Sequence, residues 1–181
     1  AGTGKTILVS DYLSTLTTNE DGWSFASINM NFYTDSLALQ QQLEQSIDKR
    51  SGKSYGPPSG RLIYFIDDLN LPQVETYGTQ TPMALMRQHI DHRTWFDRVD
   101  MGLKKTIVDS QYICCMNHKS GSFFVDPRLQ RHFVTFACHM PGEEDLTTVF
   151  GTILNHHFYN FSPKTKEHAI QMVGSQIELH K

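Results

Sequence analysis

The short run Gly2-Thr3-Gly4-Lys5-Thr6 constrains this chain more than any other part of its sequence. It matches the end of the phosphate-binding loop G-x-x-x-x-G-K-[ST], in which glycines let consecutive backbone N–H groups curl around a phosphate. A helix follows such a loop, and its N-terminal dipole favours the same negative charge. Taken alone, the run is also compatible with a Gly/Thr-rich loop beside a surface lysine.

The residue types in the loop predict ATP and Mg²⁺ as cofactors. Lys5 would place its ammonium against the β- and γ-phosphates, and the Thr6 hydroxyl would be a Mg²⁺ ligand. The predicted nucleotide-binding residues are Ala1, Gly2, Thr3, Gly4, Lys5 and Thr6. Because the chain begins inside this motif, we expect a fragment of a longer polypeptide whose first core strand is missing.

A second anchor is the run from Arg61 to Asp68, in which five apolar residues precede two aspartates. Such a run predicts a strand buried on both faces, as in a parallel sheet, with its carboxylates at the edge where α/β sheets bind ligands. Asp67 would hold Mg²⁺, and Asp68 would polarise the attacking water. The alternative is a strand that simply ends in an Asp-Asp turn.

A third group of polar residues follows the remaining strand patterns. The run Gln111–Asn117 predicts another buried strand with Asn117 at its tip, where it could orient a water or a γ-phosphate, although Asn is also a turn former. Arg128 and Arg131 precede a predicted strand over Val134–Cys138. Without further context, both are equally compatible with surface arginines.

The remaining elements complete an α/β pattern. We expect a helix from Lys5, a strand over Trp23–Met30, a helix carrying Leu39, Leu43 and Ile47, a loop over 49–60, a helix from Thr81, and a turn or hairpin over Trp95–Lys105. From Pro141 the composition changes to two amphipathic helices. This predicts two domains, a P-loop ATPase subdomain over 1–140 and the beginning of a helical lid over 141–181.

Composition argues against several classes of function. The net charge is −3 and the pI is about 6.3, so no basic face predicts nucleic acid as a partner. No apolar run is long enough to predict a membrane span. The three cysteines lack CxxC spacing and fit buried thiols in a reducing compartment. His89 and His92 have a spacing that could bind metal, but no third ligand is apparent, so no such site is predicted.

Taken together, the motifs resemble an AAA+ module of an axonemal dynein heavy chain. The resemblance covers almost the whole chain. It rests on the phosphate loop and on the runs Phe65–Pro72, Tyr77–Gln80, Leu85–Gln88, Met116–Asn117 and Pro127–Phe133. The runs Asp67–Pro72 and Pro127–Phe133 are most similar to the third module of outer-arm heavy chains.

The resemblance implies an α/β fold of the P-loop AAA+ type and an ATPase, in a microtubule motor with a ring of six modules. It gives Asp68 and Asn117 catalytic roles, the latter as sensor I, and makes Arg131 a finger that acts in trans on a neighbouring module's nucleotide. Implied partners are neighbouring modules, with intermediate chains, light chains and microtubules bound elsewhere in the parent. The implied location is the cytoplasmic cytoskeleton, in the axoneme of cilia or flagella.

Asp68 departs from the pattern of AAA+ ATPases, which usually carry Glu at this position. Because a water-activating carboxylate depends on its geometry, the shorter side chain predicts slow or regulatory hydrolysis. Two alternatives stay open. One is a structural ring segment that holds nucleotide without hydrolysing it, and the other is a different AAA+ remodelling ATPase.

Overall fold

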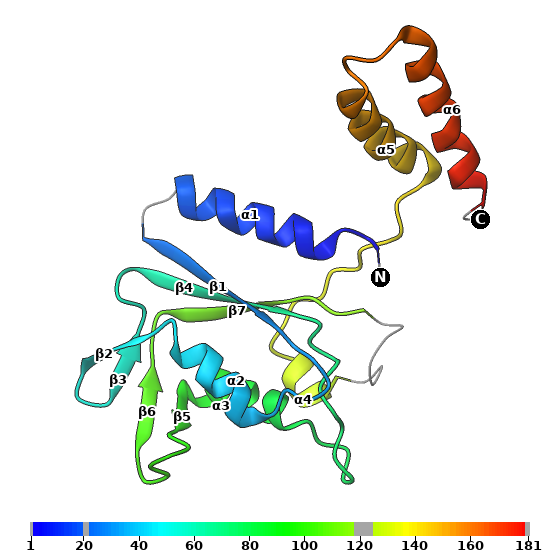
Figure 1. Cartoon of the computed structure of the whole chain (residues 1–181). Coiled ribbons are helices and arrows are strands. Elements are labelled where there is room, and N and C mark those ends of the chain that lie inside the picture. Colours follow the sequence, from blue (N-terminus) through cyan, green and yellow to red (C-terminus); the bar gives the residue numbers. More distant parts are fainter. Residues whose placement is uncertain (1, 20–21, 118–124, 180–181) are drawn as a thin grey trace. The chain divides into compact units, whose positions relative to one another are not determined.

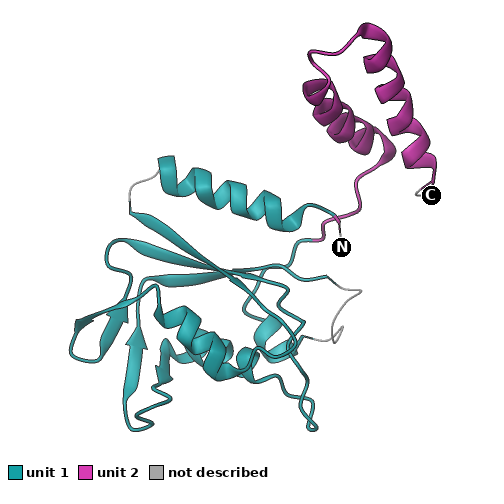
Figure 2. Cartoon of the chain, viewed as in Figure 1, with its two compact units in different colours: residues 1, 3–136 teal, residues 2, 137–181 magenta. Residues whose placement is uncertain are grey.

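The computed structural model describes residues 2–19, 22–117 and 125–179, and the chain forms two compact units (Figure 2). One unit comprises residue 1 and residues 3–136, and the other comprises residue 2 and residues 137–181. The first unit contains two sheets and four helices of the described chain, and the second contains a pair of helices.

A three-stranded parallel sheet forms the centre of the first unit. Its strands are β1 (Trp23–Asn29), β4 (Arg61–Asp67) and β7 (Ser110–Cys114), in the order β1-β4-β7. The central strand pairs along its length with both neighbours, from Trp23↔Arg61 to Asn29↔Asp67 on one side and from Leu62↔Ser110 to Ile66↔Cys114 on the other.

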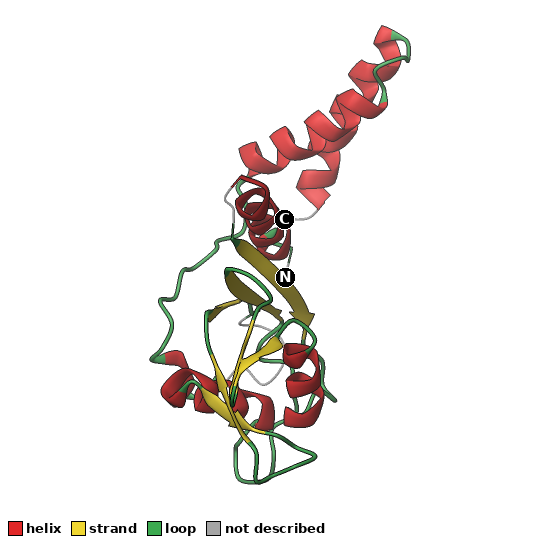
Figure 3. Cartoon of the chain, turned by 90° about the vertical axis from the view of Figure 1, so that its left-hand side faces the viewer, coloured by secondary structure: helices red, strands yellow, loops and turns green. Residues whose placement is uncertain are grey.

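The side chains of β4 alternate between two apolar clusters, and helices cover both faces of the sheet (Figure 1, Figure 3). Ile63 and Phe65 pack with Leu13 of α1 (Lys5–Asn19). Leu62, Tyr64 and Ile66 pack with residues of α2 (Ser36–Glu44), α3 (Thr81–His92) and α4 (Pro127–Gln130). The sequence-based prediction of an α/β fold with a buried parallel strand is therefore confirmed.

A second sheet corrects the prediction of a loop over residues 49–60. Its strands β2 (Asp48–Ser51), β3 (Ser54–Gly56), β5 (Thr94–Phe96) and β6 (Lys104–Ile107) lie in the order β2-β3-β6-β5. Gly52, with φ 54°, closes the antiparallel β2–β3 hairpin, and β3 gains a parallel partner in β6. The prediction of a hairpin within 95–105 is confirmed, because β5 and β6 are antiparallel.

The predicted strand over Val134–Cys138 is wrong for this structure. The segment is irregular, and no described strand pairs with it. Val134 and Phe136 are 82% and 84% exposed. An apolar pattern alone does not make a strand, because the backbone groups also need a neighbouring strand to complete the ladder of hydrogen bonds.

The second unit is a helix pair, α5 (Glu143–His157) and α6 (Pro163–Leu179). Three acidic residues fill the first turn of α5, and the Gly142 N–H donates to Asp145 Oδ2 at 3.1 Å. This end of α5 therefore has both a backbone partner and the negative charge that its dipole favours. Among the described residues, no helix combines the length and apolar character needed to span a bilayer.

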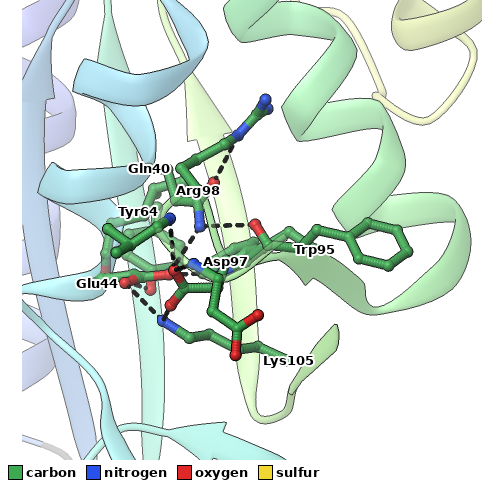
Figure 4. A network of polar contacts seen from close by, with 11 residues as sticks. Gln40, Glu44, Tyr64, Trp95, Asp97, Arg98 and Lys105 are labelled. Carbon is green, nitrogen blue, oxygen red and sulfur yellow. Dashed lines mark hydrogen bonds and ion pairs between the residues drawn. The ribbon is translucent and has the colours of Figure 1, made fainter. Parts of the chain in front are cut away.

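A polar network joins the second sheet to α2 (Figure 4). Glu44, in the last turn of α2, accepts hydrogen bonds from Trp95 Nε1 at 2.8 Å, Gln40 Nε2 at 2.9 Å and Lys105 Nζ at 3.0 Å. Lys105 also lies 2.6 Å from Asp97 Oδ2, and its side chain is only 10% exposed. The two carboxylates therefore share one largely buried ammonium.

The contacts between Lys105 and Asp97 favour the charged form of both. Burial alone would lower the pKa of Lys105, but hydrogen bonds to Asp97 and Glu44 outweigh burial and raise that pKa. The hydrogen bond from Lys105, together with the backbone N–H groups of Asp100 and Val99, lowers the pKa of Asp97 to about 2. At neutral pH, Lys105 is therefore a cation and Asp97 an anion.

We expect Lys105→Ala to destabilise the chain by about 2 kcal/mol, between the values typical of surface pairs and of fully buried ones. The substitution leaves Glu44 and Asp97 without their shared cation. Urea unfolding would measure the change. Lys104→Ala is the matched control, because its exposed side chain should change the free energy by less than about 0.5 kcal/mol. Equal losses in the two variants would contradict the role given to the network.

Candidate nucleotide-binding site

The loop that opens α1 has the backbone of a phosphate cradle. Gly2 and Gly4 have φ of 78° and 74°, a region that residues with a Cβ rarely adopt. An ideal Cβ at either glycine would meet no atom within 4 Å, so backbone conformation and not crowding requires glycine here. The Leu8 N–H donates to Gly4 O at 2.9 Å, which starts the helix directly after the loop. Ala1 lies outside the described residues.

The Lys5 ammonium stays within the loop. Its Nζ donates to Thr3 Oγ1 at 2.9 Å, and the pair is partly buried. The side chain therefore lies along the cradle and not away from it. An ammonium in this position can exchange a neutral hydroxyl oxygen for a phosphate oxygen, which is the stronger, charge-assisted acceptor.

Thr6 and Asp67 come together from positions 61 residues apart. The Thr6 hydroxyl donates to Asp67 Oδ2 at 2.6 Å, and Asp67 Oδ1 accepts the N–H of Asp68 at 3.0 Å. Asp67 is the last residue of β4, so the strand delivers its carboxylate to the N-terminus of α1. A hydroxyl and a carboxylate oxygen at this separation are ligand types that Mg²⁺ prefers, and these residues therefore fit that ion.

Asp68 adopts the left-handed backbone conformation, with φ of 54°. Asp is one of the few residues with a Cβ that tolerate this region. Two backbone hydrogen bonds hold the turn, from the Leu71 N–H to Asp68 O and from the Leu69 N–H to Cys115 O, each at 3.0 Å. The backbone thus offers a physical reason why a short acidic residue, and not Glu, occupies this position.

Asn117 follows β7, the strand that pairs with β4, as the sequence predicted. Its backbone O accepts a hydrogen bond from Asn70 Nδ2 at 2.9 Å. The segment after β7 is thereby tied to the turn that follows Asp68. Asn70, which is buried, was not among the predicted site residues, and its only sequence signal was its place in the run after Asp68. Residues 118–124 lie outside the described chain.

Arg131 lies at the end of α4 and contacts α3, not the phosphate loop. Its Nη2 is 3.0 Å from Asp91 Oδ1, while its side chain remains 63% exposed. Arg128 and Arg131 line a cavity of about 410 Å³, together with Ala84, Arg87, Gln88, Asp91 and His92. The structure therefore brings Thr6 and Asp67 together and places Arg131 on a separate surface.

The two histidines with metal-ligand spacing lie in different environments. His89 is buried, with Nδ1 2.6 Å from the Tyr112 hydroxyl, and burial lowers its pKa to about 4. His92 is exposed. Within the described residues, no cluster of three or more His, Cys, Asp or Glu side chains has the arrangement of a metal site.

A glycine loop that opens a helix, joined through its threonine to an aspartate at the carboxyl end of a parallel strand, defines a P-loop nucleotide-binding domain. A family model described as the P-loop containing dynein motor region matches residues 1–141. The chain therefore belongs to the dynein heavy chain family, as part of its P-loop motor region, and the resemblance to an axonemal dynein heavy chain is confirmed.

Relatives in animals and algae support the same family. The whole chain is 47% identical to dynein axonemal heavy chain 17 of Homo sapiens and 44% identical to the ciliary dynein beta chain of Heliocidaris crassispina. It is 41% identical, over 99% of its length, to the flagellar outer arm dynein beta chain of Chlamydomonas reinhardtii. In each case the match spans 4% of the relative's length.

We expect Lys5→Ala to abolish ATP binding at this site, because it removes the cation of the phosphate cradle. Thr6→Val keeps the side-chain shape and removes the oxygen that contacts Asp67, so it should weaken mainly the Mg²⁺-dependent part of binding. Binding of labelled ATP to the full heavy chain, with its other sites disabled, is the measurement. The control is Thr15→Val, on the exposed surface of α1. Unchanged binding by Lys5→Ala would overturn the assignment of the loop.

Proposed function

We propose that this segment is an ATP-binding AAA+ module of an axonemal dynein heavy chain, corresponding to the third module, with slow or regulatory ATP hydrolysis. One observation carries the proposal. The Thr6 hydroxyl lies 2.6 Å from Asp67 Oδ2, so the phosphate loop and the acidic end of β4 share one site. The positive φ angles of Gly2 and Gly4 support the same assignment.

Each side chain would have a distinct task. The loop N–H groups and Lys5 bind the phosphates, and Thr6 and Asp67 hold Mg²⁺. When bound, the ion would supply positive charge that offsets the charge developing on the phosphates. Asp68 would accept a hydrogen bond, and then the proton, from the water that attacks the γ-phosphate, and Asn117 would contact that phosphate. The products are ADP and inorganic phosphate.

The helix pair and the wider assembly complete the proposal. Residues 1–140 would form the large ATPase subdomain, and residues 141–181 would begin the helical lid. Neighbouring AAA+ modules would be the direct partners, while intermediate chains, light chains and microtubules would bind other parts of the parent. The names of the relatives, which are axonemal, ciliary and flagellar chains, support a place in the axoneme.

A second candidate is a module that clamps nucleotide without hydrolysing it. It is favoured by the left-handed backbone at Asp68, with φ of 54°, and by a side chain one methylene shorter than Glu. Together they restrict where the carboxylate can lie, and small misplacements of a catalytic group can be costly. A different AAA+ remodelling ATPase is a weaker alternative, given the family to which the chain belongs.

We expect Asp68→Asn to leave Mg·ATP binding intact and to lower hydrolysis by roughly tenfold or more, because an amide cannot accept the proton. Asn tolerates the left-handed region as Asp does, so the backbone should not change. Asp68→Glu extends the carboxylate by one methylene and should raise the rate or leave it unchanged, provided that Glu adopts the positive φ that favours Asp here. Single-turnover hydrolysis at this module, with the other sites disabled, measures both variants. If Asp68→Asn hydrolyses ATP as fast as the wild type, Asp68 is not the activating carboxylate, and the module that holds nucleotide without hydrolysing it becomes the better candidate.

We expect Arg131→Ala to slow hydrolysis at a neighbouring module by roughly 10³-fold, the effect typical of removing an arginine finger. Nucleotide binding at this module should not change, because Arg131 contacts α3 and not the loop. Arg128→Ala is the matched comparison and should have the smaller effect. Hydrolysis at the neighbour and binding here are measured together. Loss of nucleotide binding at this module would contradict the prediction, because it would mean that Arg131 acts on this module's own nucleotide.

A further inference from the structure

A single carboxylate oxygen on α3 holds two consecutive residues of the segment that ends α4. Asp91 Oδ1 lies 3.0 Å from Arg131 Nη2 and 2.9 Å from His132 Nε2. The Asp91 side chain is 23% exposed, and that of Arg131 is 63% exposed. The carboxylate is thus less accessible than the guanidinium that it holds, although both reach solvent.

The place of Asp91 in its helix is unfavourable in itself. It lies in the last turn of α3, where the helix dipole disfavours negative charge. Desolvation would raise its pKa further, but the hydrogen bond from Arg131 and the nearby charge of His132 hold that pKa below its ordinary value. Asp91 therefore stays ionised through its contacts with the end of α4.

The hold on Arg131 is directional. Nη2 donates to Asp91 Oδ1. Nε lies 3.3 Å from His132 Nε2, which accepts from it only while unprotonated, because a protonated Nε2 donates to Asp91 instead. Among the described residues, no hydrogen bond involves Nη1. The contact with Asp91 thereby fixes one nitrogen of a planar, rigid guanidinium, and Arg131 lines the same cavity as Arg87 and Arg128.

We propose that Asp91 is a positioning residue for Arg131, holding its guanidinium in the orientation in which it meets the phosphates of a neighbouring module. This inference rests on the proposed function of Arg131. A long side chain that is already oriented loses less conformational freedom when it binds, and its charge is in place before the transition state forms. Asp91 itself touches no nucleotide.

The same contact could have the opposite effect, in which Asp91 withholds Arg131 from the neighbour's phosphate. If Asp91 competed with the phosphate for Arg131, then removing the carboxylate would release the arginine and speed hydrolysis at the neighbour. Replacing Asp91 should therefore slow hydrolysis at the neighbour if Asp91 positions Arg131, and speed it if Asp91 withholds Arg131.

The test uses the full heavy chain in which only the neighbouring site can hydrolyse ATP. Asp91→Asn should lower kcat at that site by roughly 2- to 5-fold, the range of one partly exposed ion pair, with KM for ATP unchanged. Asp91→Glu, which keeps the charge, should recover part of the loss. In the background of Arg131→Ala, the same Asp91→Asn change should have no further effect on kcat.

Asp109→Asn is the matched control. Asp109 also forms an ion pair with an arginine, Arg50, on the surface of the same unit, and Asn tolerates its positive φ as Asp does. This variant should leave kcat at the neighbour unchanged. Melting temperatures of all the variants show whether a loss arises merely from unfolding.

Four results would overturn the inference. Faster ATP hydrolysis at the neighbouring module in Asp91→Asn would mean that Asp91 withholds Arg131 from the phosphate. An unchanged kcat would mean that the contact is only structural. An equal loss in the presence and absence of Arg131 would mean that Asp91 acts through another group. If Arg131→Ala itself leaves the neighbour unaffected, the finger proposal fails, and the role of Asp91 fails with it. A fall in Arg131→Ala without one in Asp91→Asn leaves the finger intact.

Discussion

The hydrogen bond between Thr6 and Asp67 is the contact on which the candidate site depends, and the central strand makes it possible. Asp67 is the last residue of β4, whose five preceding residues are all buried. Parallel neighbours fix the register of β4, and apolar clusters pack on both of its faces. The packed core therefore fixes the position of Asp67, and with it the 2.6 Å contact at the end of the strand. A side chain on a free loop would not be held in this way.

Outside the core, single buried or shielded charges hold elements together. Lys105 is shared by Glu44 and Asp97, and Asp91 is shared by Arg131 and His132. Lys105 of β6 joins α2 to the residue that follows β5, and Asp91 of α3 holds two consecutive residues at the end of α4. An ion pair of this kind stabilises little by itself, but it selects one arrangement of side chains among many. The positions of the second sheet and of α4 are specified in this way.

The sequence predicts best where local pattern and tertiary environment agree. The apolar run before Asp67 gave the buried strand, and the glycine-lysine motif gave the loop, because both patterns have few alternatives. The strand over Val134–Cys138 failed because its pattern says nothing about whether a partner strand is present. The β2–β3 hairpin was missed because glycine and proline around 49–60 indicate turns, while its pairing with β6 is non-local. Asp91 carried no signal, because the spacing from 91 to 131 has no meaning until α3 and α4 pack together.

The network around Glu44 couples the β5–β6 hairpin mechanically to α2. The antiparallel pair β5–β6 is anchored to α2 at several points, through Trp95, Lys105 and the backbone O of Phe96, which accepts from Gln40. The covalent path between the same elements runs through dozens of residues. A force applied at the tip of this hairpin would therefore travel through the side-chain contacts first, and it would reach α2 before the chain between them was stretched. The hairpin and the helix would move as one body, and the Lys105–Glu44 ion pair with these hydrogen bonds would set the force at which they separate.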